Sequence, residues 1–322
     1  MQSSKMQKVY IVVPMYNAKK YIDCAVNSAL AQKQIDVTLV LVDHGSSDGT
    51  YDYVKEKYGK RENIVIIGLQ RNKNEIRSAS RPLNEGFKYV AQNAPENAWV
   101  MRLDADDVLY DEATLESVIG CFEKGVLLLS GSMVFVNTDD RTAQEYCQRR
   151  EYDSLKALRR EAAYAYPHHA TLISVKLINR ILERDGYGYF EKIGYGEDLD
   201  FSLRMFAVCK ESQIRFSHVI MIIKELSGDT ITNSVQFINL MHDHFSIFYR
   251  NKSFSRLLLL KIVLWYVIDN MGKWGKKLNK TFTPPAAKYA VSCSMDYEVV
   301  CARKEMWNVN IIEENERIFT VK

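Results

Sequence analysis

The sequence has no run of about 20 apolar residues, the length that a membrane-spanning helix needs. The nearest segment, Leu257–Ile268, is interrupted by Lys261, and the N-terminal apolar stretch Val9–Met15 is too short for a signal peptide and contains Pro14. Internal repeats and low-complexity tracts are also missing. These absences argue against a membrane-spanning, exported or repeat protein and favour a cytoplasmic one.

The six cysteines include no Cys-x-x-Cys pair, so their spacing predicts no zinc site. Most of them lie in apolar surroundings, which favours a reducing compartment. The composition, with 47% hydrophobic and 26% charged residues, is that of an ordinary globular protein. The 322 residues suffice for one large α/β domain, or for a catalytic domain with an appendage.

No charge of one sign dominates, since 43 Lys and Arg oppose 40 Asp and Glu for a net charge of +3. This balance gives no reason to expect a nucleic acid partner. The charge is uneven, however: residues 251–288 carry +7, and the rest of the chain carries −4.

Four apolar segments predict buried strands: Val9–Val13, Val37–Val42, Ile64–Gly68 and Trp99–Leu103. Segments of helical periodicity separate them, at about 21–30, 51–58 and 78–92. The alternation predicts an α/β fold with a Rossmann-like, mostly parallel central sheet flanked by helices. Residues 235–277 are mostly helical in composition and predict a helical C-terminal extension.

Polar turns directly follow three of these strands, at Pro14–Asn17, Asp43–Asp48 and Asp104–Asp107. In a parallel sheet, ligands bind beyond the carboxyl ends of the strands. The three turns should therefore meet at one edge and form a site.

The turn after the fourth strand contains Asp104 and Asp106, two carboxylates that suit a hard cation such as Mg²⁺ or Mn²⁺. The alternative is an acidic turn that stabilises the start of the next helix through its dipole. Because other polar turns lie nearby, we favour the metal site.

Two further groups are candidates for chemistry. Glu197 and Asp198 begin an amphipathic helix, where an ionised carboxylate can take a proton from a hydroxyl. Acidic residues also simply suit a first helical turn, so both interpretations stay open. His168 and His169 are either acceptor contacts or a structural pair, and a shared metal is not expected of them.

Together these motifs resemble the family 2 glycosyltransferases of bacterial glycan biosynthesis, which have the GT-A fold. The resemblance covers about residues 8–235 and rests on five segments in the family's order: Val12–Asn17, Asp43–Thr50, Leu83–Gly86, Leu103–Val108 and Gly196–Asp200.

The resemblance implies a hexosyl- or N-acetylhexosaminyltransferase that inverts the anomeric carbon of a nucleotide-diphosphate sugar. The acceptor would be a hydroxyl of a glycan or lipid-linked acceptor, in surface polysaccharide or lipopolysaccharide synthesis. Asp198 would be the base and Glu197 its orienting partner, while Asp106 and Asp104 would hold Mn²⁺ or Mg²⁺. His168 and His169 would contact the acceptor. The candidate donor-binding residues are Pro14, Tyr16, Asn17, Asp43, His44, Ser46, Arg77, Arg81, Asp104 and Asp106.

The sequence departs from the family pattern in two places. His44 stands where the family usually has a second Asp that reads uracil, although a neutral imidazole can still accept, so a UDP-sugar remains the expected donor. No His occurs at 224–229, where many members have one, so either Asp229 serves as an extra metal ligand or the role is absent.

We expect a catalytic domain at 1–235, with a nucleotide-sugar half at about 8–110 and an acceptor half at about 111–235. Residues 236–322 would form a mainly helical region. Its basic segment 251–288 either contacts the inner face of the plasma membrane or packs in the core or a homodimer. The competing functions are a non-catalytic binding or scaffold protein on the same fold and a sugar nucleotidyltransferase, although the latter's Gly-rich phosphate loop is missing from Pro14–Lys19.

Overall fold

The computed structural model describes residues 6–72, 75, 78–121, 124–148, 168–189, 191–194, 196–226, 242–243, 246–247, 250–251 and 290–308. The helical region expected at 235–277 and the basic segment 251–288 lie almost wholly outside these residues. Among the helices within them, none combines the length and apolarity needed to cross a lipid bilayer.

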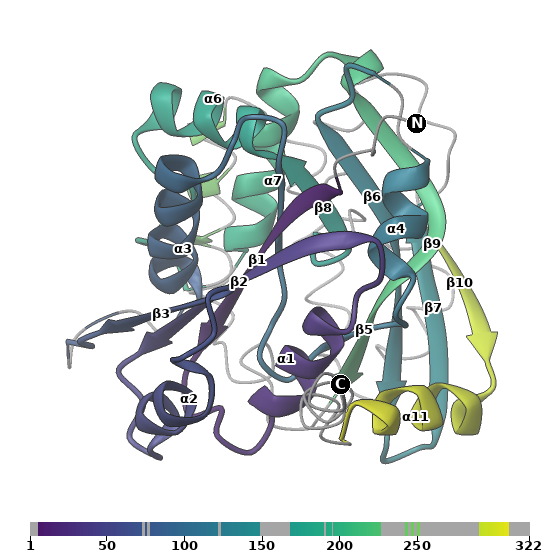
Figure 1. Cartoon of the computed structure of the whole chain (residues 1–322). Helices are drawn as coiled ribbons and strands as arrows, with labels where there is room; N and C mark the ends of the chain where they lie inside the picture. The colour runs from purple at the N-terminus through teal and green to yellow at the C-terminus, as the bar shows by residue number, and fades with distance from the viewer. Residues whose placement is uncertain are drawn as a thin grey trace, which may run out of the picture.

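The first half of the chain alternates strands and helices as predicted (Figure 1). The strands β3, β2, β1 and β4 lie side by side in that order, and each neighbouring pair is parallel. The elements are β1 (Gln7–Met15), α1 (Ile22–Leu30), β2 (Ile35–His44), α2 (Thr50–Tyr58), β3 (Ile64–Leu69), α3 (Ser80–Asn93) and β4 (Trp99–Arg102).

Beyond β4 the same sheet continues with mixed strand directions, because β8 and then β6 and β7 join it antiparallel. The long strand β9 runs parallel to β6 and also pairs with the short β5. The elements are β5 (Val108–Leu109), α4 (Thr114–Gly120), β6 (Leu128–Asn137), β7 (Thr142–Gln148), β8 (Thr171–Ser174), α6 (Val175–Asp185), α7 (Glu197–Val208), η2 (Glu211–Gln213) and β9 (Ile214–Leu226).

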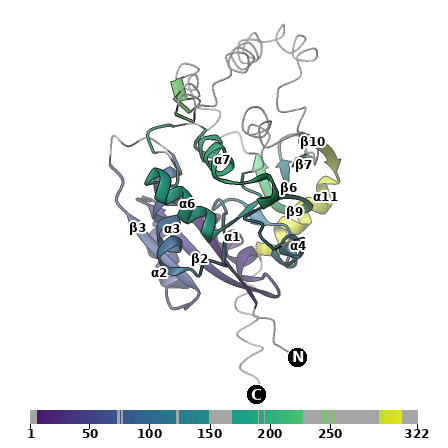
Figure 2. The same ribbon diagram turned by 90° about the horizontal axis from the view of Figure 1, so that it is seen from above.

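Both faces of the parallel strands are buried, which explains their unbroken apolar sequences. On β1, Tyr10 and Val12 face one core with α3, α6 and α7, whereas Ile11 and Val13 face a second core with α1 and α4. The two views of the chain show α3 and α6 on one side of the sheet and α4 on the other (Figures 1 and 2).

The C-terminal part contributes to this sheet in a way that the sequence did not predict. Strand β10 (Ala290–Met295) pairs antiparallel with β7, and α11 (Tyr297–Glu305) and the short 3-10 helix η5 (Met306–Asn308) follow. Val300 and Trp307 are buried in a third core with Val108 of β5 and Ile223 of β9. These described residues therefore pack against the same central sheet.

The packing of α3 explains why the segment Leu83–Gly86 ends in a glycine. A Cβ there would lie 2.3 Å from Cγ1 of Val12 on β1. We expect Gly86→Ala to lower the free energy of unfolding by about 1–3 kcal/mol, because overpacking a tight helix–strand contact forces the backbone apart. Urea denaturation measures this effect.

Gly120, at the end of α4, provides the matched control, because a Cβ there has no neighbour within 4 Å in the described part of the chain. Gly120→Ala should be neutral or stabilising by up to about 1 kcal/mol. Equal effects of the two substitutions would show that packing against Val12 is not the reason for Gly86.

Candidate active site

The predicted meeting of polar turns at the carboxyl ends of β1 and β2 is present. The Ser46 backbone N–H donates to Asp43 Oδ2 at 3.0 Å, and the Ser46 hydroxyl donates to Asp43 Oδ1 at 2.5 Å. The Asn17 backbone N–H donates to Ser46 Oγ at 2.9 Å, and Asn17 Oδ1 accepts from the Ser47 N–H at 2.9 Å. Asn17 has a φ of 51°, so the chain turns sharply after Pro14 and leaves Tyr16 exposed. These contacts fix the two loops against each other.

His44 is buried and pairs with a residue that the sequence did not identify. Its Nε2 lies 2.8 Å from Glu75 Oε1, and Glu75 Oε2 accepts from Arg81 Nη1 at 2.7 Å. Although burial opposes ionisation, Arg81, the Asn72 N–H and His44 lower the pKa of Glu75 to about 2. An ionised carboxylate cannot donate, so Nε2 of His44 carries the shared proton and only Nδ1 is left to accept. The candidate Arg77 lies outside the described residues.

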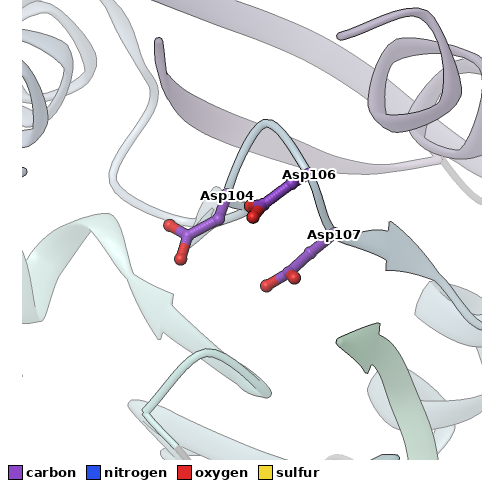
Figure 3. Close-up of side chains that lie close together, drawn as sticks. All are labelled: Asp104, Asp106 and Asp107. Carbon is purple, nitrogen blue, oxygen red and sulfur yellow. The ribbon is translucent and has the colours of Figure 1, made fainter. Parts of the chain in front are cut away.

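Three carboxylates, rather than the two predicted, cluster in the turn after β4 (Figure 3). Asp104, Asp106 and Asp107 each offer an oxygen, and these oxygens lie within 4.8 Å of one another. Asp106 is exposed, Asp104 is partly buried and Asp107 is fully buried. Asp107 belongs to the predicted turn but was not among the predicted ligands.

Two cations, the buried Arg102 and the partly buried Lys224, compensate this cluster. Arg102, the last residue of β4, donates from Nε to Asp104 Oδ1 at 2.6 Å and from Nη2 to Oδ2 at 3.2 Å. Lys224 of β9 donates to Asp104 Oδ2 at 3.2 Å and to Asp107 Oδ2 at 2.9 Å. Burial alone would raise the pKa of Asp104, but Arg102, Lys224 and His169 hold it well below its usual range. Burial dominates at Asp107 and raises its pKa to about 7.

The cluster fits a hard divalent cation. Carboxylate oxygens are the ligands that Mg²⁺ and Mn²⁺ prefer. Oδ1 of Asp107 is buried and has no hydrogen-bond partner among the described residues, which is costly unless something else binds there. Asp106 and Asp107 thus offer unoccupied oxygens, whereas both oxygens of Asp104 already accept hydrogen bonds.

Glu197 and Asp198 open helix α7 behind Gly196, whose φ of 80° makes the sharp turn into the helix. Nη1 of Arg102 lies 3.9 Å from Glu197 Oε1. The same guanidinium therefore contacts one of the three clustered carboxylates and one of the predicted catalytic pair.

The protein shifts the pKa values of this pair in opposite directions. Burial, and then the neighbouring Asp198, raise the pKa of Glu197 to about 7. Burial opposes ionisation of Asp198 as well, but His168, His169 and Arg102 together lower its pKa. Burial also lowers the pKa of His168 to about 3, and the Leu199 N–H donates to Asp198 Oδ1 at 2.8 Å. Such opposed shifts are typical of acid–base sites.

The raised pKa of Glu197 predicts a pH-dependent gain in stability for Glu197→Gln. The folded protein holds the Glu197 proton up to about pH 7, because burial raises its pKa, whereas a free Glu loses its proton near pH 4.5. The contribution of this proton to the free energy of unfolding is complete below pH 4.5 and is lost as the pH rises through 7. Glutamine avoids that loss, so the variant should be more stable than wild type at pH 8, by about 1–3 kcal/mol, and equal near pH 4.5.

Urea denaturation of metal-free protein at several pH values measures this difference. Glu116→Gln is the matched control, because Glu116 is also in a first helical turn but is exposed. A stability difference between Glu197→Gln and wild type that does not change with pH would contradict the prediction.

The two predicted acceptor histidines lie in different surroundings. His169 Nε2 is 3.2 Å from Asp104 Oδ2, at the carboxylate cluster. His168 is buried, with Nε2 at 2.6 Å from the Tyr189 hydroxyl and Nδ1 at 3.2 Å from Ser202 Oγ. Asn84 on α3 holds the loop that contains Tyr189. Its side chain donates to the Tyr189 carbonyl at 2.8 Å and accepts from the Tyr189 N–H at 2.5 Å.

Sequence reasoning missed Arg102, Lys224, Glu75 and Asp107. A signal existed for Arg102, because it interrupts the apolar segment Trp99–Leu103, and a buried charge is expected to be paired. Lys224 had no such signal, since β9 also carries Arg215, His218 and Glu225. No comparable signal marks Glu75, which lies in a polar loop.

Comparisons with known proteins agree with this geometry. The sequence model of "Glycosyl transferase family 2" matches residues 10–182. The chondroitin synthase of Escherichia coli is 36% identical over 123 residues, 37% of this chain and 16% of that protein. The poly(ribitol-phosphate) beta-N-acetylglucosaminyltransferase TarS of Staphylococcus aureus is 32% identical over 109 residues, 33% of this chain and 18% of that protein.

The fold is also that of a solved structure. The crystal structure of S. aureus TarS 1-349 in complex with UDP-GlcNAc covers 94% of this chain and 92% of its own, at a TM-score of 0.55 and 18% identity. This likeness shows the GT-A fold that the sequence predicted. The present chain spans only part of the curated relatives, for example 40% of an uncharacterised glycosyltransferase from Nostoc.

Proposed function

Since this chain belongs to glycosyl transferase family 2, whose model matches residues 10–182, we propose that it transfers a sugar from a nucleotide-diphosphate donor to an acceptor hydroxyl, with inversion. One observation carries the proposal: Arg102 contacts both Asp104, at 2.6 Å, and Glu197, at 3.9 Å. Because Glu197 directly precedes the candidate base Asp198 on α7, the carboxylate cluster and this pair belong to one site, as a single displacement requires.

The roles follow from position and charge. The loops of Asn17, Asp43 and Ser46 bind the nucleoside, together with His44. Asp198 is ionised and accepts the proton of the acceptor hydroxyl, whose oxygen then attacks the anomeric carbon from the side opposite the leaving diphosphate. Glu197, next to it on α7, orients the acceptor. His169 lies close enough to Asp104 to approach the donor, while His168 supports Tyr189 and α7.

Asp106 and Asp107 would hold Mn²⁺ or Mg²⁺, with Asp104 fixed beside them by Arg102. When bound, the cation supplies charge stabilisation for the departing nucleoside diphosphate. Arg102 adds a permanent positive charge in the same place.

The donor is a UDP-sugar in this proposal. TarS was solved in complex with UDP-GlcNAc, and Nδ1 of His44 remains as an acceptor for a ring N–H of the base. A thermal-shift series with UDP, GDP, CDP and dTDP plus Mn²⁺ tests this choice. UDP should give the largest stabilisation, and stabilisation by GDP alone would refute the UDP assignment.

The acceptor is a hydroxyl of a glycan or lipid-linked acceptor, in the synthesis of a surface polysaccharide. Relatives named hyaluronan synthase, chondroitin synthase and poly(ribitol-phosphate) beta-N-acetylglucosaminyltransferase support a polysaccharide product. Residues 251–288 would bring the enzyme to an anionic membrane or form a dimer, and they lie almost wholly outside the described residues. Transfer from the donor, or its slow hydrolysis without an acceptor, would separate this enzyme from a non-catalytic scaffold.

A further inference from the structure

The ammonium of Lys224 lies between two carboxylates of the metal cluster, 2.9 Å from Asp107 Oδ2 and 3.2 Å from Asp104 Oδ2. The pairing of Val108 with Ile223 between β5 and β9 brings Lys224 beside Asp107. Lys224 is also the first residue of the stretch 224–229 that lacks the expected His. The cluster thus contains a cation of its own.

Arg102 and Lys224 compensate most, but not all, of the negative charge of the carboxylate cluster. The three carboxylates together with Arg102 and Lys224 sum to −1 if all are ionised. A divalent cation that enters this cluster meets an ammonium within contact distance of two carboxylates. The metal and the ammonium therefore compete for the negative charge of the same carboxylates and repel each other.

Of the two cationic side chains, Lys224 is the one whose charged group can move away from the carboxylates. Arg102 grips Asp104 with two nitrogens and ends a buried strand. The Lys224 side chain is 22% exposed, and its ammonium is a point charge on a flexible four-carbon stem. Moving that stem needs no change in the backbone of β9.

We propose that Lys224 is the resident counter-cation of the carboxylate cluster, and that a divalent cation binds by displacing its ammonium from Asp107 and Asp104. Lys224 is thus a residue that sets metal affinity in the proposed transferase, on which this inference rests. It keeps the buried carboxylates compensated while no metal is bound, and it weakens metal binding.

The test is the affinity of the full-length protein for Mn²⁺ alone, measured by the EPR signal of free Mn²⁺ without any sugar nucleotide. Lys224→Met should bind Mn²⁺ about 10- to 100-fold more tightly than wild type, the scale on which partners of ligating carboxylates change metal affinity. Lys8→Met is the control and should bind as wild type does, because Lys8 pairs with Asp36 in an exposed pair on strands β1 and β2.

Lys224→Gln is the second variant, for the case that Lys224→Met does not fold, because its amide still donates hydrogen bonds but carries no charge. It should also bind more tightly than wild type. Equal or weaker binding by the folded variants, or no binding by any of the proteins, would overturn the inference. No donor is present, so this result is separate from the nucleotide series, which tests the proposed function.

Discussion

Asp198→Asn is expected to lower the rate of sugar transfer by about 10²- to 10⁴-fold, the usual contribution of a positioned general base. The substitution keeps the shape of the side chain, and its amide oxygen can still accept from the Leu199 N–H, which lies 2.8 Å from Asp198 Oδ1. What it removes is the charge that takes the acceptor proton. The apparent affinity for the donor should stay within a few-fold, because the donor loops lie on other elements.

Two measurements test this expectation together: initial rates with saturating donor, and the thermal shift caused by the nucleotide. Asp52→Asn is the matched control, since Asp52 also lies in the first turn of a helix, α2, but is exposed. It should transfer at the wild-type rate. Wild-type turnover by Asp198→Asn would falsify the assignment of Asp198 as the base.

Trp307→Ala is expected to lower the free energy of unfolding by about 3–5 kcal/mol, as usual for a buried Trp. Trp307 is fully buried, and its indole N–H donates to the Leu109 carbonyl at 3.0 Å. Its own carbonyl accepts from Nδ2 of Asn27 on α1 at 2.9 Å. Alanine leaves a cavity and an unpaired buried carbonyl on β5, the strand that directly follows the carboxylate cluster.

Urea denaturation measures this loss, with the slope of the transition as a check that the unfolding reaction is unchanged. Met306→Ala is the control, because Met306 is the neighbour of Trp307 in the chain but is 37% exposed. This substitution should lower the free energy of unfolding by less than about 1 kcal/mol. Trp307→Phe should lie between the two, since it retains the ring but not the N–H. Similar values for Trp307→Ala and Met306→Ala would mean that η5 does not hold β5.

Much of the site could be predicted because its residues lie where strands end. The positions of Asp43, Asp104 and Asp106 follow from the rule that turns at the carboxyl ends of parallel strands share one edge. Likewise, the apolar spacing of 197–208 sufficed to place Glu197 and Asp198 at the start of a helix. These are local patterns, and they need no knowledge of long-range packing.

Other parts could not be predicted because they depend on contacts between distant segments. Lys224 and Asp107 are separated by 117 residues in the chain and meet only through the register of β5 with β9. Glu75 reaches His44 from a loop without a distinguishing pattern. The strand β10 gave no clear signal either, since its partner β7 lies far away in the chain.

By itself, therefore, the sequence determined the α/β alternation, the family and the edge of the sheet that carries the carboxylates, because each depends on periodicity or on short motifs. Only the tertiary structure decided which charges compensate those carboxylates, and that the residues around Trp307 hold β5. A buried carboxylate is stabilised by whichever cation the packing brings within about 3–4 Å, and that partner is set by sheet register rather than by spacing along the chain.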